Sequence, residues 1–172
     1  MDYLVEGKSR KELRALAYSL REHLGLTEAL YFPVVETPDV LEEIIDKFSY
    51  EIVEDDELPI SVHAETDVVT GHIKIKDSVY NRAAQGEGRD RMTIAHEIGH
   101  FFTICVCGFK LQRNFDENAV VPPYRRPEWQ AKCFAGELMV PAHLIDGLTP
   151  LNIAEKCGVS ESAASFQYEH KD

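Results

Sequence analysis

The sequence has few positive charges for its size. It contains 18 Lys and Arg residues against 30 Asp and Glu residues, so its formal net charge is −12 at pH 7. Proteins that bind nucleic acids draw much of their affinity from basic side chains that neutralise phosphates. The charge therefore disfavours the nucleic-acid-binding proteins as a class, and we expect no direct nucleic-acid partner.

Long apolar runs are also missing. No run approaches the roughly 20 residues that a membrane-spanning helix needs, and the first residues, MDYLVEGKSRKEL, lack the apolar centre of a signal peptide. We therefore expect a cytoplasmic protein with no membrane partner. The chain has four cysteines, and in a reducing compartment they are expected to be free thiols. Cys105 and Cys107 would point apart on a helix, which disfavours a metal-binding pair.

The length and composition fit one domain of the α+β class. A chain of 172 residues with 44 % hydrophobic residues can bury a single core. The patterns predict a small, mostly antiparallel sheet packed on helices, one of which carries a zinc motif. We expect an N-terminal helix within residues 1–30, a catalytic core at 31–141, and a C-terminal helix-turn-helix-like hairpin at 142–172.

Helix signals and strand signals alternate along the first half of the chain. Ser9-Arg-Lys-Glu12 is a capping box that predicts a helix ending at Gly25, and Thr37-Pro38-Asp39 predicts the start of a second helix. Segments 50–54, 60–64 and 71–76 have strand patterns, and 67–71 is typical of a turn.

The segment 71–76 alternates between two faces. Ile73 and Ile75 lie on one face, whereas Lys74 and its lysine and histidine neighbours lie on the other. A half-exposed strand that bears lysines indicates a sheet edge. Such an edge near the zinc helix can hold an extended peptide by strand addition, and this makes Lys74 a candidate substrate-contacting residue. The alternative, that the lysines only protect the edge from pairing, stays open.

The main chemical motif is His96-Glu97-Ile98-Gly99-His100. On a helix, residues four apart lie on the same face, so His96 and His100 can bind one zinc ion. Glu97 lies about 100° further round the helix, where it can reach a water molecule but not the metal. The pattern predicts a metallopeptidase site with Glu97 as general base. Ile94 and Ile98 lie on the opposite face, so the helix should be central and buried.

A third ligand is expected from a later helix that starts at Pro127 and runs to about Val140. Glu128, Ala131 and Ala135 share one face of this helix, and small residues allow close packing on another helix. A catalytic zinc needs three protein ligands and one open position. We therefore predict Glu128 as the third ligand of one zinc per chain; Glu137, the rival, points about 180° away.

The C-terminal segment has a helix-turn-helix pattern around Gly158 and Ser160. From His143 to Asp172 there are two lysines, no arginines and five acidic residues. A DNA-recognition helix needs contacts with phosphates and bases. We therefore interpret this segment as a packed helical hairpin rather than a DNA-binding element.

Two blocks of this sequence resemble a known family. Arg91–His100, RMTIAHEIGH, is similar to the R-x-T-x-A-H-E-x-G-H block of the ImmA/IrrE metallopeptidases. Glu128–Pro141 is similar to their second block, E-x-x-A-N-x-F-A-x-x-L-L-M-P, although Lys132 stands where asparagine is usual. The similarity runs roughly over residues 32–164 and is most specific in these blocks.

The resemblance implies a zinc endopeptidase with ligands His96, His100 and Glu128 and catalytic Glu97. It also implies a bacterial, cytoplasmic protein that cleaves a helix-turn-helix transcriptional repressor, and so releases gene expression of a phage-like mobile element or a stress response. The alternative is a non-catalytic, metal-bound regulatory module that binds a repressor or an antitoxin-like partner. Tyr124 and His143 are candidate donors to the oxyanion of the transition state.

Overall fold

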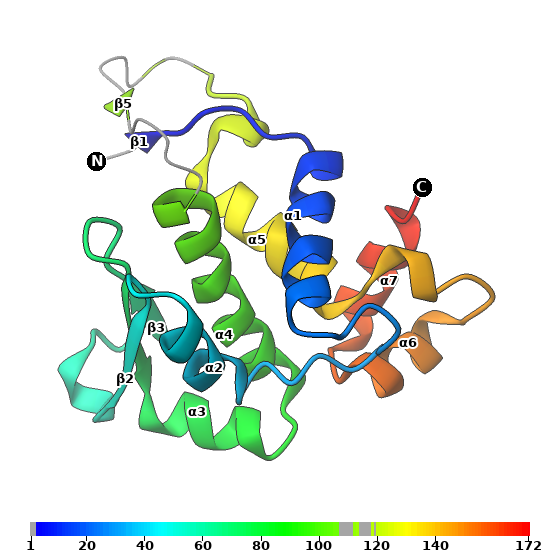
Figure 1. Ribbon diagram of the computed structural model, residues 1–172, viewed down its shortest axis with the longest axis horizontal. Coiled ribbons are helices and arrows are strands. Elements are labelled where there is room, and N and C mark those ends of the chain that lie inside the picture. The colour runs from blue at the N-terminus through cyan, green and yellow to red at the C-terminus, as the bar shows by residue number, and fades with distance from the viewer. Residues whose placement is uncertain (1–2, 107–111, 114–117, 119) are drawn as a thin grey trace.

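We describe the computed structural model at residues 3–106, 112–113, 118 and 120–172. Helices and strands within these residues form an α+β fold (Figure 1). Seven α-helices are present among the described residues: α1 (Arg10–His23), α2 (Thr37–Ile44), α3 (Asp77–Ala84), α4 (Gly88–His100), α5 (Pro127–Met139), α6 (Pro150–Cys157) and α7 (Glu161–Glu169).

The main sheet has three strands in the order β2-β4-β3 and is mixed. β2 (Ser49–Val53) pairs with β4 (His72–Lys76) in parallel, and β3 (Ala64–Thr66) pairs with β4 antiparallel. A separate antiparallel pair joins β1 (Tyr3–Leu4) to β5 (Gln112–Arg113). The sheet is therefore less antiparallel than predicted, because the chain crosses from β2 to the far edge before it returns as β4.

Two sequence predictions about this sheet are wrong. β4 is the central strand, not an edge, so its lysines do not protect an open edge. The predicted strand at 60–64 is largely a turn, because the amide of Val62 donates to the carbonyl of Pro59 and Ile60 is 98 % exposed. The strand starts only at Ala64. The predicted turn at 67–71 is confirmed by a hydrogen bond from the amide of Gly71 to the carbonyl of Asp67.

α4 and α5 lie side by side at the centre of the molecule. Figure 1 shows α5 between α4 and α1. Ile94 and Ile98 of α4 are fully buried, as the sequence predicts, and Phe134 of α5 is fully buried as well. At its end α4 continues as a π-helical turn, Phe101–Val106. The helix that carries His96 and His100 is therefore covered by α5 on one side and by β3 on another.

The capping signals define the helices that surround this centre. Ser9 caps α1 with the full capping box that the sequence predicts, and α1 packs on α5. The C-terminal hairpin is also confirmed: α6 ends at Gly158, whose φ is 65°, and Ser160 caps α7. The buried Arg91 of α4 donates to the carbonyl of Gly158 at 3.0 Å. The arginine that opens the block Arg91–His100 thus holds the hairpin against α4.

Among the described residues, no helix is both long enough and apolar enough to cross a membrane. Cys105, Cys133 and Cys157 are free thiols, as expected, and Cys107 lies outside the described residues.

Candidate metal centre

α4 presents two histidines on one face. The imidazole rings of His96 and His100 meet edge to face, with their centroids 4.7 Å apart and their planes at 86°. The side chain of His100 is only 10 % exposed and that of His96 is 25 % exposed. This geometry follows from the spacing of four residues, which places both side chains one above the other on a helix.

Glu128, in the first turn of α5, completes the cluster. Its two carboxylate oxygens contact the Nε2 atoms of His96 at 3.0 Å and His100 at 3.1 Å. The ligand atoms of all three residues lie within 4.8 Å of one another. The structure therefore brings together two imidazole nitrogens and one carboxylate that the sequence separates by about thirty residues.

A close approach of two helices makes this meeting possible. Gly99 of α4 faces the backbone of Ala131 in α5, and a Cβ added at Gly99 would lie 2.7 Å from the carbonyl oxygen of Ala131. Only a residue without a side chain fits there. The contact lies beside His100 on α4 and less than one turn from Glu128 on α5, so it sets the separation of the ligands.

Hydrogen bonds within the cluster shift the pKa values of Glu128 and His100. Hydrogen bonds from His100 and His96 hold the pKa of the Glu128 carboxyl well below its usual range. Burial lowers the pKa of His100, but the hydrogen bond to Glu128 and the nearby charge of Glu97 outweigh burial, so that its pKa is raised. Glu128 therefore stays ionised, and protons compete with a metal at His100.

Glu97 lies beside the cluster and has a partner of its own. The hydroxyl of Thr66, in β3, donates to Oε2 of Glu97 at 2.6 Å and is 3.2 Å from its main-chain oxygen. Glu97 is only 7 % exposed. This bond fixes one carboxylate oxygen and leaves Oε1 as the oxygen available for proton transfer.

The donor set fits a catalytic zinc ion. Two imidazole nitrogens and a carboxylate are the ligands of one common class of zinc enzyme, in which a fourth position stays open. The side chain of Glu128 is 77 % exposed, so the cluster is accessible from solvent. The Nδ1 atom of His100 is buried and has no hydrogen-bond partner among the described residues. The contacts that hold this ring are those of its Nε2 atom with Glu128 at 3.1 Å and of its edge with His96.

Lys74 is not brought to the cluster. In β4 it points to the face opposite Ile73, whereas Thr66, the partner of Ile73 across the pair, points toward Glu97. The Nζ atom of Lys74 lies 3.9 Å from a carboxylate oxygen of Glu51 in β2. The side chain of Lys74 therefore lies on the face of the sheet opposite Thr66 and Glu97.

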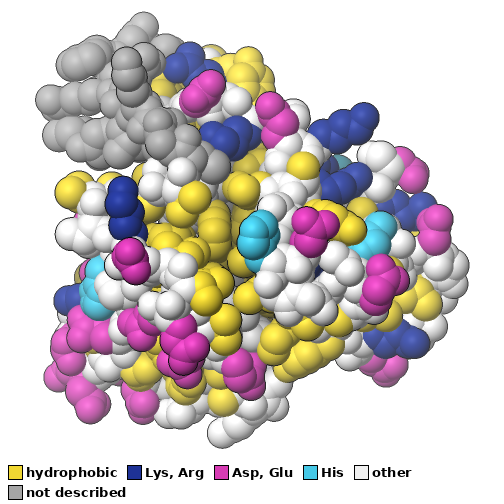
Figure 2. Space-filling model, viewed as in Figure 1, with side chains coloured by type: hydrophobic (Ala, Val, Ile, Leu, Met, Phe, Trp, Pro, Cys, Tyr) yellow, Lys and Arg dark blue, Asp and Glu magenta, His cyan; other side chains and the backbone are white. Residues whose placement is uncertain are grey.

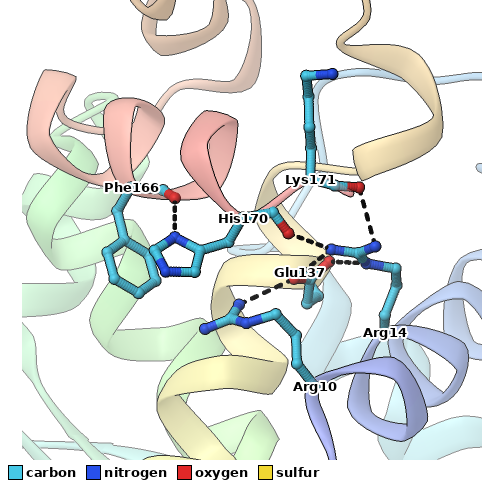
Figure 3. Close-up of polar contacts among 6 residues, drawn as sticks. All are labelled: Arg10, Arg14, Glu137, Phe166, His170 and Lys171. Carbon is cyan, nitrogen blue, oxygen red and sulfur yellow. Dashed lines mark hydrogen bonds and ion pairs between the residues drawn. The ribbon is translucent and has the colours of Figure 1, made fainter.

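His143 and Glu137 lie elsewhere. Glu137 is buried at the other end of α5 and pairs with Arg10 at 3.0 Å and Arg14 at 2.8 Å (Figure 3). His143 contacts the carbonyl oxygen of Thr27 through Nε2 at 2.6 Å. The structure therefore separates His143 from the metal ligands, and Glu137, the rival ligand, takes no part in the cluster.

Tyr124 lies four residues before Glu128, in the short 3-10 turn η3 (Pro123–Arg125). Its ring is against Gly7, where an added Cβ would meet it at 2.8 Å, and the side chain is half-exposed. Its carbonyl accepts from the side-chain amide of Gln130 at 2.8 Å. The role of Tyr124 in the transition state stays a prediction.

Thr66 is the site residue that sequence reasoning missed. It falls at the end of a three-residue strand, outside the strand that we predicted at 60–64. Its hydroxyl meets Glu97 only because β3 forms the sheet edge next to α4. A single threonine carries no sequence signal for such a contact.

Comparison with known families agrees with this geometry. The sequence model of the family described as IrrE N-terminal-like domain (Peptidase_M78) matches residues 63–168 of the chain. The matched region includes all three cluster residues, Glu97 and Thr66. A search of curated proteins found no match.

Proposed function

Because this chain belongs to the ImmA/IrrE family of metallopeptidases, we propose that it is a zinc-dependent endopeptidase. Its ligands are His96, His100 and Glu128, and its general base is Glu97. The observation that carries the proposal is the convergence of three ligand atoms within 4.8 Å beside a carboxylate that is itself held by Thr66.

Zn²⁺ bound by these residues would supply Lewis acidity, which acidifies a water molecule and polarises a peptide carbonyl. The carboxylate of Glu97 accepts a proton from the attacking water and returns it to the leaving amine. Thr66 keeps this carboxylate in one orientation through its 2.6 Å hydrogen bond. Such positioning matters because proton transfer requires the base to lie within hydrogen-bond reach of the water.

The free edge of β3 is a suitable place for an extended substrate. Glu65 pairs with Lys74 of β4, so β3 has one paired edge and one edge without a strand partner among the described residues. Thr66 on this strand touches Glu97. A peptide added to β3 would run past the carboxylate of Glu97. This is the strand addition that we expected at segment 71–76, but it takes place at β3 instead of β4.

We propose a helix-turn-helix transcriptional repressor as the substrate, so that cleavage releases gene expression of a mobile element or a stress response. The net charge of −12 supports a basic partner. Segment 42–57 alone has eight exposed acidic side chains against one lysine, and Figure 2 shows acidic side chains gathered at the lower left of the molecule. DNA-binding proteins are typically basic, so such a surface favours their approach.

Metal analysis and a cleavage assay test this proposal together. Purified protein should contain about one zinc per chain, and Glu128→Ala should lose it, whereas the control Glu155→Ala, an exposed carboxylate of α6, should keep it. Glu97→Gln should also keep the zinc. Mass spectrometry of a repressor encoded near this gene, after coexpression, should show one new pair of fragments with the wild type only.

The outcomes separate the alternatives. Zinc kept in Glu97→Gln together with loss of cleavage supports the peptidase. Zinc with no cleavage by the wild type, but with a stable complex of the two proteins, supports the non-catalytic regulatory module. Zinc kept unchanged in Glu128→Ala would remove Glu128 from the ligand set and contradict the metal centre described above.

A further inference from the structure

A pocket of about 330 Å³ lies on the side of α5 that faces α1, away from the metal ligands. It is lined by residues of α1, by the end of α5 and by η4 (Ala142–Leu144). Its size is at the lower end of the range for small-molecule sites in proteins. Neither the sequence motifs nor the proposed peptidase activity accounts for it.

The lining of this pocket is positively charged in a strongly acidic protein. Lys11, Arg14 and Arg21 contribute three cations, and Glu137 contributes one anion. The chain as a whole has a net charge of −12. A concave site with an excess of positive charge attracts anions, and the low-dielectric walls strengthen that attraction.

Two of the three cations are already engaged by the protein. Arg14 donates to Glu137 at 2.8 Å and also to the main-chain oxygens of His170 and Lys171 (Figure 3). Arg21 is buried and donates to main-chain oxygens, among them that of Leu138 at 2.8 Å. These guanidinium groups supply positive charge but few free donors.

Lys11 is different. No hydrogen bond or ion pair joins its side chain to another residue in the described part of the chain, and it is exposed at the pocket.

The Tyr18 ring lies edge-on to the ring of His143, with centroids 5.2 Å apart. The Nε2 atom of His143 donates to the carbonyl of Thr27, because a carbonyl only accepts. In the neutral ring Nδ1 then only accepts, so it suits an N–H of a ligand and not its carboxylate.

The rest of the lining is apolar. It comprises Ala15, Pro141 and Ala142, together with the ring of Tyr18. An inorganic anion would gain no free energy of binding from these apolar groups. A ligand with an apolar body would gain it by packing against them.

We propose that this pocket is a binding site for a small carboxylate with an apolar body. The carboxylate pairs with the ammonium of Lys11, and the body packs against Ala15, Tyr18 and Pro141. The carboxylate can belong to a free organic acid or to the end of a peptide, since both present the same chemistry. The site does not require the metal or the peptidase activity.

N-acetyl-L-phenylalanine is a suitable probe, and its amide is the neutral control. Titration of the wild-type protein, followed by two-dimensional amide NMR, should show saturable shifts at Ala15, Tyr18 and Ala142. For a ligand of this size we expect a Kd of about 1 mM. The amide should bind at least about tenfold more weakly, because it cannot form the ion pair. The peptide Gly-Gly-Phe distinguishes the end of a peptide from a free acid, and saturable binding of either with a Kd of about 1 mM supports the proposal.

Two variants test the residues. Lys11→Gln should weaken binding at least about tenfold, whereas Lys156→Gln, which removes one charge from α6, should leave it unchanged. Binding should also persist in His96→Ala, which separates this pocket from carboxylate binding at the metal. Equal binding of acid and amide, unchanged binding in Lys11→Gln, loss in His96→Ala, or no saturable shift would each overturn the proposal. Melting temperatures of the variants confirm that each is folded.

Discussion

For the substitution Gly99→Ala in α4, helix propensity and the tertiary structure predict opposite changes in stability. Replacing glycine by alanine within a helix normally stabilises it by about 0.8–1.0 kcal/mol, because glycine loses more backbone entropy on folding. A Cβ at Gly99, however, would lie 2.7 Å from the carbonyl oxygen of Ala131 and 3.1 Å from its Cα atom. Both are backbone atoms of α5, so the helix as a whole must move to relieve the clash.

The magnitude follows from this contact. An ordinary contact is at least 3.4 Å, so the helices must separate by about 0.7 Å at this point. Overpacking of this kind costs about 1–3 kcal/mol, which exceeds the gain in helix propensity. Gly99→Ala should therefore lower the free energy of unfolding by up to about 2 kcal/mol, and the melting temperature by about 2–4 °C for each kcal/mol.

Gly99→Ala should weaken zinc binding more than it destabilises the fold. Gly99 is next to His100, and Ala131 is three residues from Glu128, so separation of the helices pulls these ligands apart. Metal–ligand distances tolerate about ±0.2 Å. We expect zinc affinity in Gly99→Ala to fall at least about tenfold, measured by competition with a chelating dye.

Gly136→Ala is the matched control. A Cβ there would meet the side-chain amide of Gln167 at 2.7 Å, and this flexible end of a side chain can turn away. We expect its melting temperature to stay the same or rise, with unchanged zinc affinity. If Gly99→Ala melted at or above the temperature of Gly136→Ala and bound zinc as well as the wild type, the close approach of α4 and α5 would not control the site.

Three further measurements test the chemistry of the site and of the core. Thr66→Val removes the hydroxyl that donates to Glu97, so cleavage should slow at least about tenfold while the zinc content stays unchanged. Thr66→Ser should restore cleavage. Full turnover in the valine variant would contradict a positioning role for Thr66. Zinc affinity should fall as pH decreases, because the raised pKa of His100 keeps this ring protonated at pH values where an ordinary histidine is neutral; calorimetry that found equal affinity at about pH 6 and about pH 8 would refute this. Burial raises the pKa of the Cys133 and Cys157 thiols to about 11, so at about pH 8 both should react with a disulfide reagent only after unfolding; rapid reaction of the native protein would show that they are accessible.

Local periodicity made several features predictable from the sequence. The capping box at Ser9 and the turn at Gly71 depend on neighbouring residues, and both are found where we expected them. The pairing of the strands was not predictable in the same way. β4 alternates like an edge strand, but it lies between β2 and β3 because the order of strands depends on contacts between distant segments. Of its two lysines only Lys74 is partly exposed, whereas Lys76 is buried and donates to the carbonyl of Pro59, so neither marks an open edge.

The sequence by itself determined the paired histidines and the direction of Glu97, because the helical repeat places side chains one turn apart on the same face whatever the rest of the chain does. It also pointed to Glu128, although nothing local could show that α5 would bring this carboxylate to the histidines. Only the tertiary structure decided that meeting, through the absence of a side chain at Gly99, and only it brought Thr66 to Glu97. Contacts between segments far apart in the chain depend on how whole elements pack, and packing is a property of all their residues together.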